Sequence, residues 1–366
     1  VTGKVDGRKG TNTIDYSGNT ADNKVNLQTK VATGMASFAN IQQIVGAGIH
    51  TTLVGRNSTS TWNITADNTG AVGATTFAGV GHLTGGTQAD TFVLADGAGV
   101  SGKIDGGAGK TNVLSYALYT VRITVDLTAF AATNVTGGIA KLGSFVGGTS
   151  MSDTLVGPNQ ANVWTVSAAN AGKLNAMPFT GFENLTGGTQ ADAFVFSKGI
   201  GVSGQIDGGG GRNRLDYRAY VTPVAVDLPS GTATNTAGVA NIQDVTGGTQ
   251  GDALTGNDQD NVFLGNGGND TLTGNDGRDL LFGGDGLDTI WGGLGEDLIA
   301  NGKTTFDTNW AVLHALRGCW TGGLSFADRT QQLATGTTGI VDENVRAPGP
   351  CAVSGGRNKI PQEPQG

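Results

Sequence analysis

Residues 265–300 read GNGGNDTLT GNDGRDLLF GGDGLDTIW GGLGEDLIA, and this stretch decides the fold. Each block of nine begins with glycine, has an acidic residue at its sixth position and an apolar residue at its eighth. Self-similarity over four successive blocks is typical of repeat architectures, in which each short unit packs against the next. We therefore expect short strands that alternate with glycine-rich turns.

The negative charge of the chain is concentrated in the same region. Residues 247–300 contain nine Asp, one Glu and one Arg, a net charge of −9, whereas the whole chain of 366 residues has −8. Only 14% of all residues are charged, which is not the composition of a charge-solvated disordered chain. The acidic residues therefore belong to the repeats and do not serve general solubility.

A longer repeat precedes the nonapeptides. The sequence GKVDGRKGTNTIDY at 3–16 returns as GKIDGGAGKTNVLSY at 102–116 and as GQIDGGGGRNRLDY at 204–217. These long units contain degenerate copies of the nonapeptide, GGTQADTFV at 85–93 and GGTQADAFV at 187–195. We infer that one short unit underlies the whole chain and is strict only in its last part.

Strand signals lie between the turns, and no segment before residue 300 has helical periodicity. Short apolar groups such as VFL, LLF and TIW are rich in β-branched and aromatic residues. The prediction is an all-β fold, an elongated parallel β-solenoid or β-roll with a short α-helical C-terminal cap. Its expected parts are two degenerate repeat units (1–101 and 102–203), a truncated third unit (204–246), a calcium-binding nonapeptide β-roll (247–302), a helical cap (303–336) and an irregular tail (337–366).

Two short helices are expected after residue 303. The first has Asp307 or Thr308 as its cap and Gly318 as its end. Its apolar stripe consists of Trp310, Leu313 and Leu316. The second is SFADRTQQLATG at 325–336, which has a capping-box pattern and a terminating glycine. Both helices are expected to close the C-terminal end of the solenoid.

The residue types at the turns favour a hard cation. Glycine permits backbone conformations that turn carbonyl oxygens toward one point, and the sixth-position carboxylate adds more oxygen atoms. Six to eight oxygen ligands in a flexible loop suit Ca²⁺ better than Mg²⁺ or a transition metal. The eighth-position residues point inward in this arrangement and form the core; they are Leu254, Phe263, Leu272, Leu281, Ile290 and Ile299.

This motif, G-G-x-G-x-D followed by x-apolar-x, resembles the RTX (haemolysin-type) calcium-binding nonapeptide family over 256–300. In that family two nonapeptides form one turn of a β-roll, and Ca²⁺ lies between turns that stack on the same edge. The resemblance implies one edge lined by Asp252, Asp270 and Asp288, and another lined by Asn261, Asp279 and Asp297. The expected metal-site residues are these six together with Asp258, Asp276, Asp285, Gly256, Gly265, Gly267, Gly274, Gly283 and Gly292.

The degenerate copies at 85–93 and 187–195 leave two alternatives open. Gln88 and Gln190 replace a turn glycine, so that Asp90 and Asp192 either bind metal or hold their turns without it.

Two tryptophans and two cysteines also have two interpretations each. Trp62 and Trp164 take equivalent positions in the long units, which favours core packing over a sugar-stacking role. Cys319 and Cys351 either form one disulfide in an exported protein or remain free thiols.

Several functional classes have no support in the sequence. GGAGKT at 106–111 lacks the glycine spacing of a phosphate loop, and there is no HExxH or GxSxG motif. The chain has no basic stripe for nucleic acid and no apolar run near the ~20 residues of a membrane span.

We therefore expect a non-enzymatic, secreted or cell-surface bacterial protein, a calcium-stabilised β-solenoid that serves as a stalk, adhesin, or matrix or fibril component. The long units also resemble repeats of very large secreted or surface proteins of bacteria, and we interpret the chain as part of a longer protein. The alternative is a C-terminal calcium-dependent folding and secretion module of a larger exported enzyme. The expected partners are calcium ions, with end-to-end self-association into filaments as a further prediction.

Overall fold

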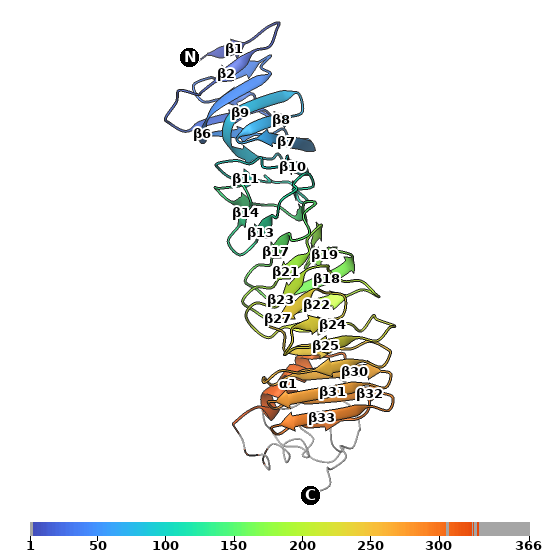
Figure 1. The fold of residues 1–366 in the computed structure, drawn as a ribbon. Helices are drawn as coiled ribbons and strands as arrows, with labels where there is room; N and C mark the ends of the chain where they lie inside the picture. Colours follow the sequence, from blue (N-terminus) through green and yellow to red (C-terminus); the bar gives the residue numbers. More distant parts are fainter. Residues whose placement is uncertain (1–2, 305–306, 324, 326–327, 329–366) are drawn as a thin grey trace, which may run out of the picture. The chain divides into compact units, whose positions relative to one another are not determined.

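The computed structural model of the chain describes residues 3–304, 307–323, 325 and 328. Over these residues the fold is nearly all β, with mostly parallel strand pairing and one short helix (Figure 1). The all-β prediction is therefore confirmed. The chain divides into two compact units, one of Val1–Asn159 with Asn170–Gly188 and one of Gln160–Ala169 with Thr189–Gly366.

The first unit consists of short strands that pair mostly in parallel. β7 (Ser60–Ala66) pairs in parallel with β10 (Asp90–Leu94), and β10 pairs in parallel with β12 (Val113–Ser115). Hairpins such as that of β7 with β8 (Thr69–Val72) interrupt this pattern. The other strands of this unit are β1 (Lys4–Asp6), β2 (Thr13–Asp15), β3 (Asn23–Asn26), β4 (Val31–Ala32), β5 (Ser37–Ala39), β6 (Gln43–Val54), β9 (Thr75–Thr84), β11 (Ile104–Asp105), β13 (Thr124–Asp126), β14 (Ala131–Ala132), β15 (Ile139–Ala140), β16 (Ser144–Val146), β17 (Thr154–Val156), β19 (Ala171–Leu174), β20 (Met177–Thr180) and β21 (Asn184–Thr186).

The two equivalent tryptophans are core residues of their own units. Trp62 is fully buried and stacks on Phe92 with 5.5 Å between ring centroids. Trp164 is also fully buried and stacks on Phe194 at 5.7 Å. Core packing, and not sugar stacking, therefore accounts for both positions.

In the second unit the strand spacing shortens along the chain. Its strands are β18 (Asn162–Ala168), β22 (Asp192–Phe196), β23 (Gln205–Asp207), β24 (Arg214–Asp216), β25 (Ala225–Asp227), β26 (Thr232–Ala233), β27 (Gly238–Ala240), β28 (Asp244–Thr246), β29 (Ala253–Thr255), β30 (Val262–Gly267), β31 (Thr271–Asp276), β32 (Leu280–Asp285), β33 (Thr289–Leu294) and β34 (Leu298–Ala300). β18 pairs with β22 thirty residues later, whereas β30 pairs with β32 eighteen residues later. Two nonapeptides thus form one turn, as the resemblance implies, in residues 244–300, which we call the roll. The strict period does not extend to the longer turns before residue 244.

Successive nonapeptides of the roll alternate between two sheets. β28, β30, β32 and β34 form one of them, and β29, β31 and β33 belong to the other. Four of the six eighth-position residues are almost fully buried, as predicted: Leu254, Phe263, Leu272 and Leu281. Ile290 and Ile299 are only half-buried because they belong to the last strand of each sheet. The predicted core is therefore complete except at this last turn.

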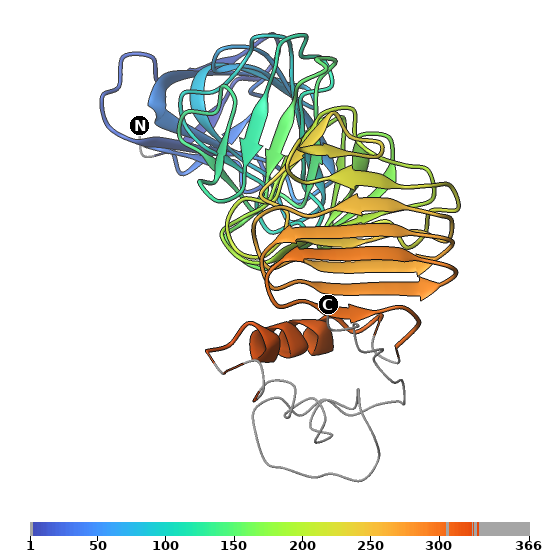
Figure 2. The ribbon, with the colours of Figure 1, turned by 60° about the horizontal axis from the view of Figure 1, so that its bottom comes forward.

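The helix α1 (Trp310–Trp320) packs on the outer face of the sheet that contains β30, β32 and β34 (Figure 2). The apolar side chains of that face are Val262, Leu264, Leu280, Phe282 and Leu298. The residues of α1 that pack against them are the predicted stripe of Trp310, Leu313 and Leu316, extended by Trp320. α1 therefore covers a side of the roll, which differs from the expected position over its end.

The helix also begins later than the sequence predicts. Asn309 is the N-cap, because its Oδ1 accepts a hydrogen bond from the Val312 amide at 3.2 Å. Asp307, one of the two predicted caps, instead accepts a hydrogen bond from the Thr304 amide at 2.9 Å.

The predicted end of the helix at Gly318 is wrong by two residues. The helix continues to Trp320, whose ring is buried against the roll and whose Nε1 donates to the Glu296 carbonyl at 2.5 Å. This tertiary contact outweighs the weak helix propensity of glycine. The second predicted helix, 325–336, lies outside the described residues except for its first and fourth residues, and the tail after it lies wholly outside them.

Candidate metal centre

The sixth-position side chains of the roll stack in two columns, one at each edge. On one edge the backbone amide of Asp252 donates to Asp270 Oδ1 at 2.7 Å. The amide of Asp270 in turn donates to Asp288 Oδ1 at 3.0 Å. Each carboxylate therefore ties its own turn to the turn before it.

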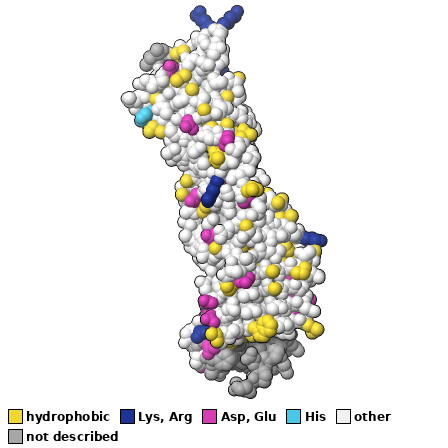
Figure 3. Space-filling view, in the orientation of Figure 1, with side chains coloured by type: hydrophobic (Ala, Val, Ile, Leu, Met, Phe, Trp, Pro, Cys, Tyr) yellow, Lys and Arg dark blue, Asp and Glu magenta, His cyan; other side chains and the backbone are white. Residues whose placement is uncertain are grey.

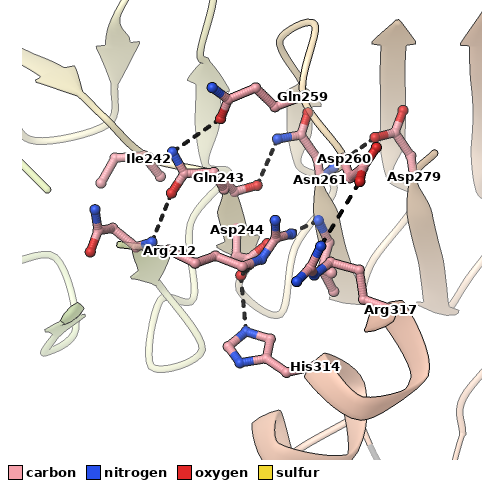
Figure 4. Close-up of polar contacts among 12 residues, drawn as sticks. Arg212, Ile242, Gln243, Asp244, Gln259, Asp260, Asn261, Asp279, His314 and Arg317 are labelled. Carbon is pink, nitrogen blue, oxygen red and sulfur yellow. Dashed lines mark hydrogen bonds and ion pairs between the residues drawn. The ribbon is translucent and has the colours of Figure 1, made fainter. Parts of the chain in front are cut away.

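The other edge repeats this arrangement. The amide of Asn261 donates to Asp279 Oδ1 at 2.7 Å, and the amide of Asp279 donates to Asp297 Oδ1 at 3.0 Å. Figure 4 shows Asn261 and Asp279 next to each other in this column. The structure thus brings together the same two sets of three residues that the resemblance implied.

The second oxygen of three carboxylates has no hydrogen-bond partner. Asp270 and Asp279 are 1% and 0% exposed, yet their Oδ2 atoms, like that of Asp288, accept no hydrogen bond. Leaving a buried carboxylate oxygen unsatisfied is costly, so such an atom marks a place for a bound cation or a proton.

Two of these oxygens, Asp270 Oδ2 and Asp279 Oδ2, each face a backbone carbonyl across a first-position glycine. A Cβ added to Gly274 would collide with both Asp279 Oδ2 and the carbonyl oxygen of Gly292. A Cβ added to Gly265 would collide with Asp270 Oδ2 and with the carbonyl oxygen of Gly283. When the carboxyl group is ionised, two atoms that can only accept hydrogen bonds therefore converge on one point. A Cβ added to Gly256, Gly283 or Gly292 would likewise collide with the sixth-position side chain of the same turn.

Burial raises the pKa of the central carboxyl groups. The pKa of Asp279 rises to about 7, mainly through burial, with a smaller contribution from the charge of Asp297. The pKa of Asp270 also rises to about 7, again mainly through burial, with smaller contributions from Asp252 and Asp288. The charge of Arg212 lowers the pKa of Asp279 only slightly against this burial, so a bound cation would supply most of the compensating positive charge.

Two predicted ligands are already satisfied by the backbone. Asp252 accepts hydrogen bonds from the amides of Val224 (2.7 Å) and Gly248 (2.5 Å), although burial still raises its pKa to about 6. Asn261 Oδ1 accepts a hydrogen bond from the Asn257 amide at 3.0 Å. Both residues stand in the columns, but neither presents a free oxygen in the manner of Asp279.

The fourth position of the nonapeptide separates two kinds of turn. From residue 265 onward the second and fourth positions have positive φ, for example 104° at Gly284 and 136° at Gly286. Gln250 and Gln259 hold the fourth position in the two preceding turns and do not have positive φ. We call 265–270, 274–279, 283–288 and 292–297 the glycine turns, and 85–90, 247–252 and 256–261 the glutamine turns.

The predicted third-position residues lie on the surface of the turns. Asp258, Asp276 and Asp285 are exposed, and Asp285 forms an ion pair with Lys303. Gly267 holds the same position, and a Cβ added there would meet nothing closer than 3.8 Å. These residues differ from the buried sixth-position groups, and their role as ligands stays a prediction.

Carbonyl and carboxylate oxygens make up the donor set at the glycine turns. Within the described residues no three side chains of His, Cys, Asp or Glu converge as a metal site, so backbone carbonyls would supply most ligands. Ca²⁺ accepts mixed carbonyl and carboxylate oxygens in flexible loops. Asp270 and Asp279, each facing a carbonyl of the next turn, therefore fit a calcium ion.

A buried ionic cluster beside the second column was missed in the sequence. Asp244 is fully buried, accepts two hydrogen bonds from Arg212 and lies 3.1 Å from Nε2 of His314 on α1 (Figure 4). The sequence contains one signal for this cluster. Asp244 is in register with Val262 of the next turn, so it is an acid at a strand position that is otherwise apolar.

Fifth-position residues connect the same edge to α1. The Arg278 amide donates to Asp260 Oδ1 at 2.9 Å, and its guanidinium lies 3.5 Å from Glu296. Arg278 Nη1 also donates to the Thr321 carbonyl at 3.3 Å, and Arg317 lies 3.9 Å from Asp260. The helix is thus held by this column as well as by the apolar face.

Acidic side chains are visible on the surface near the last strands. On the face in Figure 3 several of them lie close together in the lower part of the molecule.

No helix among the described residues has both the length and the apolar character needed to span a membrane.

Residues 246–281 and 264–299 match the family model of the RTX calcium-binding nonapeptide repeat, with four copies. A search of curated proteins finds no match to the chain. The repeats of this family bind Ca²⁺. The resemblance is therefore confirmed for residues 246–299, and this segment binds calcium.

Proposed function

We propose that the protein is a non-enzymatic, extracellular β-solenoid that serves as a structural or adhesive element and is stabilised by calcium. One observation carries the proposal: buried Asp270 Oδ2 and Asp279 Oδ2 face carbonyl oxygens of the next turn with no donor between them. A cation at these points would join successive turns, so that calcium becomes part of the scaffold.

The mechanism is coupled folding and metal binding. Residues 247–300 carry a net charge of −9, which opposes compaction when no cation is bound. A ligand that binds only the folded state stabilises it by about 2.7 kcal/mol at a concentration of 100 Kd. Millimolar calcium outside a cell would therefore favour the folded roll, and the low calcium inside would not.

Two observations support an extracellular location. Proteins with RTX repeats are typically secreted by bacteria. Cys319 is disulfide-bonded. Disulfides persist in oxidising compartments outside the cytosol.

Attachment assays with the bacterium that makes the protein test the proposal. Cells with the wild-type protein are compared with cells that make an Asp270→Ala, Asp279→Ala variant, in calcium and in chelator. The proposal expects attachment or surface-layer cohesion to fall in the variant and in chelator, while hydrolytic activities in the culture fluid stay constant. Unchanged attachment in both cases would contradict it.

The alternative role, a C-terminal folding and secretion module of a larger exported enzyme, is favoured by a different observation. α1 packs its apolar stripe on the roll, so the calcium-binding turns and the helix share one core. Such a segment could fold as a unit after export. In the same assay this role predicts the loss of a secreted enzymatic activity in the variant, with attachment unaffected.

A further inference from the structure

Asparagine replaces aspartate at two turn positions of the long repeats. Asn112 and Asn213 are both fully buried, and each belongs to a glycine-rich turn outside the roll. Their backbone partners show how such a turn is completed without a carboxylate.

The oxygen of each amide has the same role as Oδ1 in the calcium-binding columns. Asn213 Oδ1 accepts a hydrogen bond from the Asp192 amide at 2.9 Å, and Asn112 Oδ1 accepts one from the Asp90 amide at 2.9 Å. In the roll Asp279 Oδ1 accepts a hydrogen bond from the turn before it in the same way. The difference between the turns therefore lies in the second atom of the side-chain head group.

The amide nitrogen of Asn213 bridges two carbonyl oxygens. It donates to the carbonyl of Gly210 in its own turn at 3.2 Å and to that of Asn241 in the next turn at 2.9 Å. A Cβ added to Gly208 would collide with this nitrogen and with the Asn241 carbonyl oxygen. This is the arrangement found at Gly274, with nitrogen in the place of Asp279 Oδ2.

Asn112 repeats this bridge in the first unit. Its Nδ2 donates to the carbonyls of Gly109 at 2.9 Å and Lys141 at 3.0 Å. A Cβ added to Gly106 would collide with Nδ2 and with the Lys141 carbonyl oxygen. The same bridge therefore occurs independently in both units.

We propose that the side-chain amides of Asn112 and Asn213 take the place of the calcium ion in their turns. In the glycine turns 265–270 and 274–279 two acceptors face each other and need a cation. In the turns of Asn112 and Asn213, the asparagine turns, a neutral N–H donor already joins the side chain to the carbonyl. Because the amide is neutral, burying it does not require the desolvation of a charge. The turn also does not need to bind a ligand. The asparagine turns are thus complete without metal, and one atom per turn decides whether calcium is required.

Exchange of that atom in both directions tests the proposal in the full chain. Asn213→Asp should melt several degrees lower than wild type in chelator, recover in millimolar calcium, and bind one more calcium ion per chain. Asp279→Asn should bind one fewer and lose less stability on chelation than wild type does. Thermal melts and isothermal titration with CaCl₂ give both readouts.

Asn213→Ala is the matched control, because it removes the bridge and offers no carboxylate. It should lose the same stability in calcium and in chelator. Asn112→Asp serves as the second variant if Asn213→Asp does not fold. The proposal is overturned if the Asn→Asp variants lose stability equally in both conditions with unchanged calcium stoichiometry. Binding by the wild-type chain in the same titration tests calcium binding by the roll separately.

Discussion

The glutamine turns and the glycine turns satisfy their sixth-position side chain in different ways. In a glutamine turn the second-position amide donates to that side chain, as Gly86 does to Asp90 at 2.7 Å and Gly248 to Asp252 at 2.5 Å. In a glycine turn Oδ2 of Asp279 accepts no hydrogen bond.

The backbone explains this difference. Glycine adopts positive φ readily and glutamine does not, so only turns with glycine at the fourth position take the conformation with positive φ at positions two and four. That conformation turns the amide away from the carboxylate and leaves an oxygen free. The fourth residue thus determines whether the turn's own amide donates to Oδ2 of the acid or leaves that oxygen to a cation.

The largest effect is expected where a side chain would fill the calcium site. Gly274→Ala places a methyl group against Asp279 Oδ2 and the Gly292 carbonyl, and should cost about 2–3 kcal/mol of unfolding free energy in calcium. The matched control is Gly267→Ala, where the nearest atom is 3.8 Å away. Denaturant unfolding in millimolar calcium measures both, and equal losses would mean that the glycines do not border a site.

Removal of one acid from each kind of turn sharpens the comparison. Asp279→Ala should abolish about 2–3 kcal/mol of calcium-dependent stability, since it removes a ligand from a site between stacked turns. Asp90→Ala should cost stability equally in calcium and in chelator, because the Gly86 amide already donates to Asp90 Oδ2 at 2.7 Å. A calcium-dependent loss in Asp90→Ala would show that the glutamine turns bind metal as well.

The raised pKa values predict a pH dependence with opposite signs for the two states of the roll. Without calcium, Asp270 and Asp279, with pKa about 7, favour the folded state when protonated. The contribution of these two groups to the unfolding free energy of the metal-free roll should therefore be fully present below pH ~4. It should be lost as the pH rises through 7.

Calcium binds the deprotonated groups, so its affinity should rise with pH and fall by up to about tenfold for each pH unit below 7. Calcium titrations at pH 5, 6, 7 and 8 check this, and an affinity independent of pH would contradict the assignment of these carboxylates.

The smallest effect is expected at the surface of a glycine turn. Lys303 and Asp285, which form an ion pair, are 61% and 64% exposed. Lys303→Ala should change the unfolding free energy by less than about 0.5 kcal/mol and leave calcium affinity unchanged. A marked rise in calcium affinity would indicate that Asp285 is a ligand that the lysine competes for.

The columns of the roll could be predicted from sequence because they depend on spacing alone. A nine-residue period with alternating strands brings residues eighteen apart into register, which places Asp252, Asp270 and Asp288 on one edge. The buried eighth positions follow from the same alternation. The free carboxylate oxygens could not be predicted, because they depend on how each turn orients its amides.

The position of α1 also has a signal in the sequence. In alternate nonapeptides the seventh and ninth positions are apolar, as in VFL at 262–264 and LLF at 280–282, whereas TLT at 271–273 is polar there. A sheet that is apolar on both faces needs a cover on each. This pattern predicts that an apolar helix stripe packs on that sheet, as α1 does.

Hydrogen–deuterium exchange of the full chain, with calcium and with excess chelator, tests the central claim most directly. Peptides from 265–300 should lose most of their protection when calcium is removed, because the glycine turns are left with facing acceptors. Peptides from 102–116 should keep theirs, because the Asn112 amide completes that turn. Protection lost equally in both segments, or unchanged in both, would contradict the account.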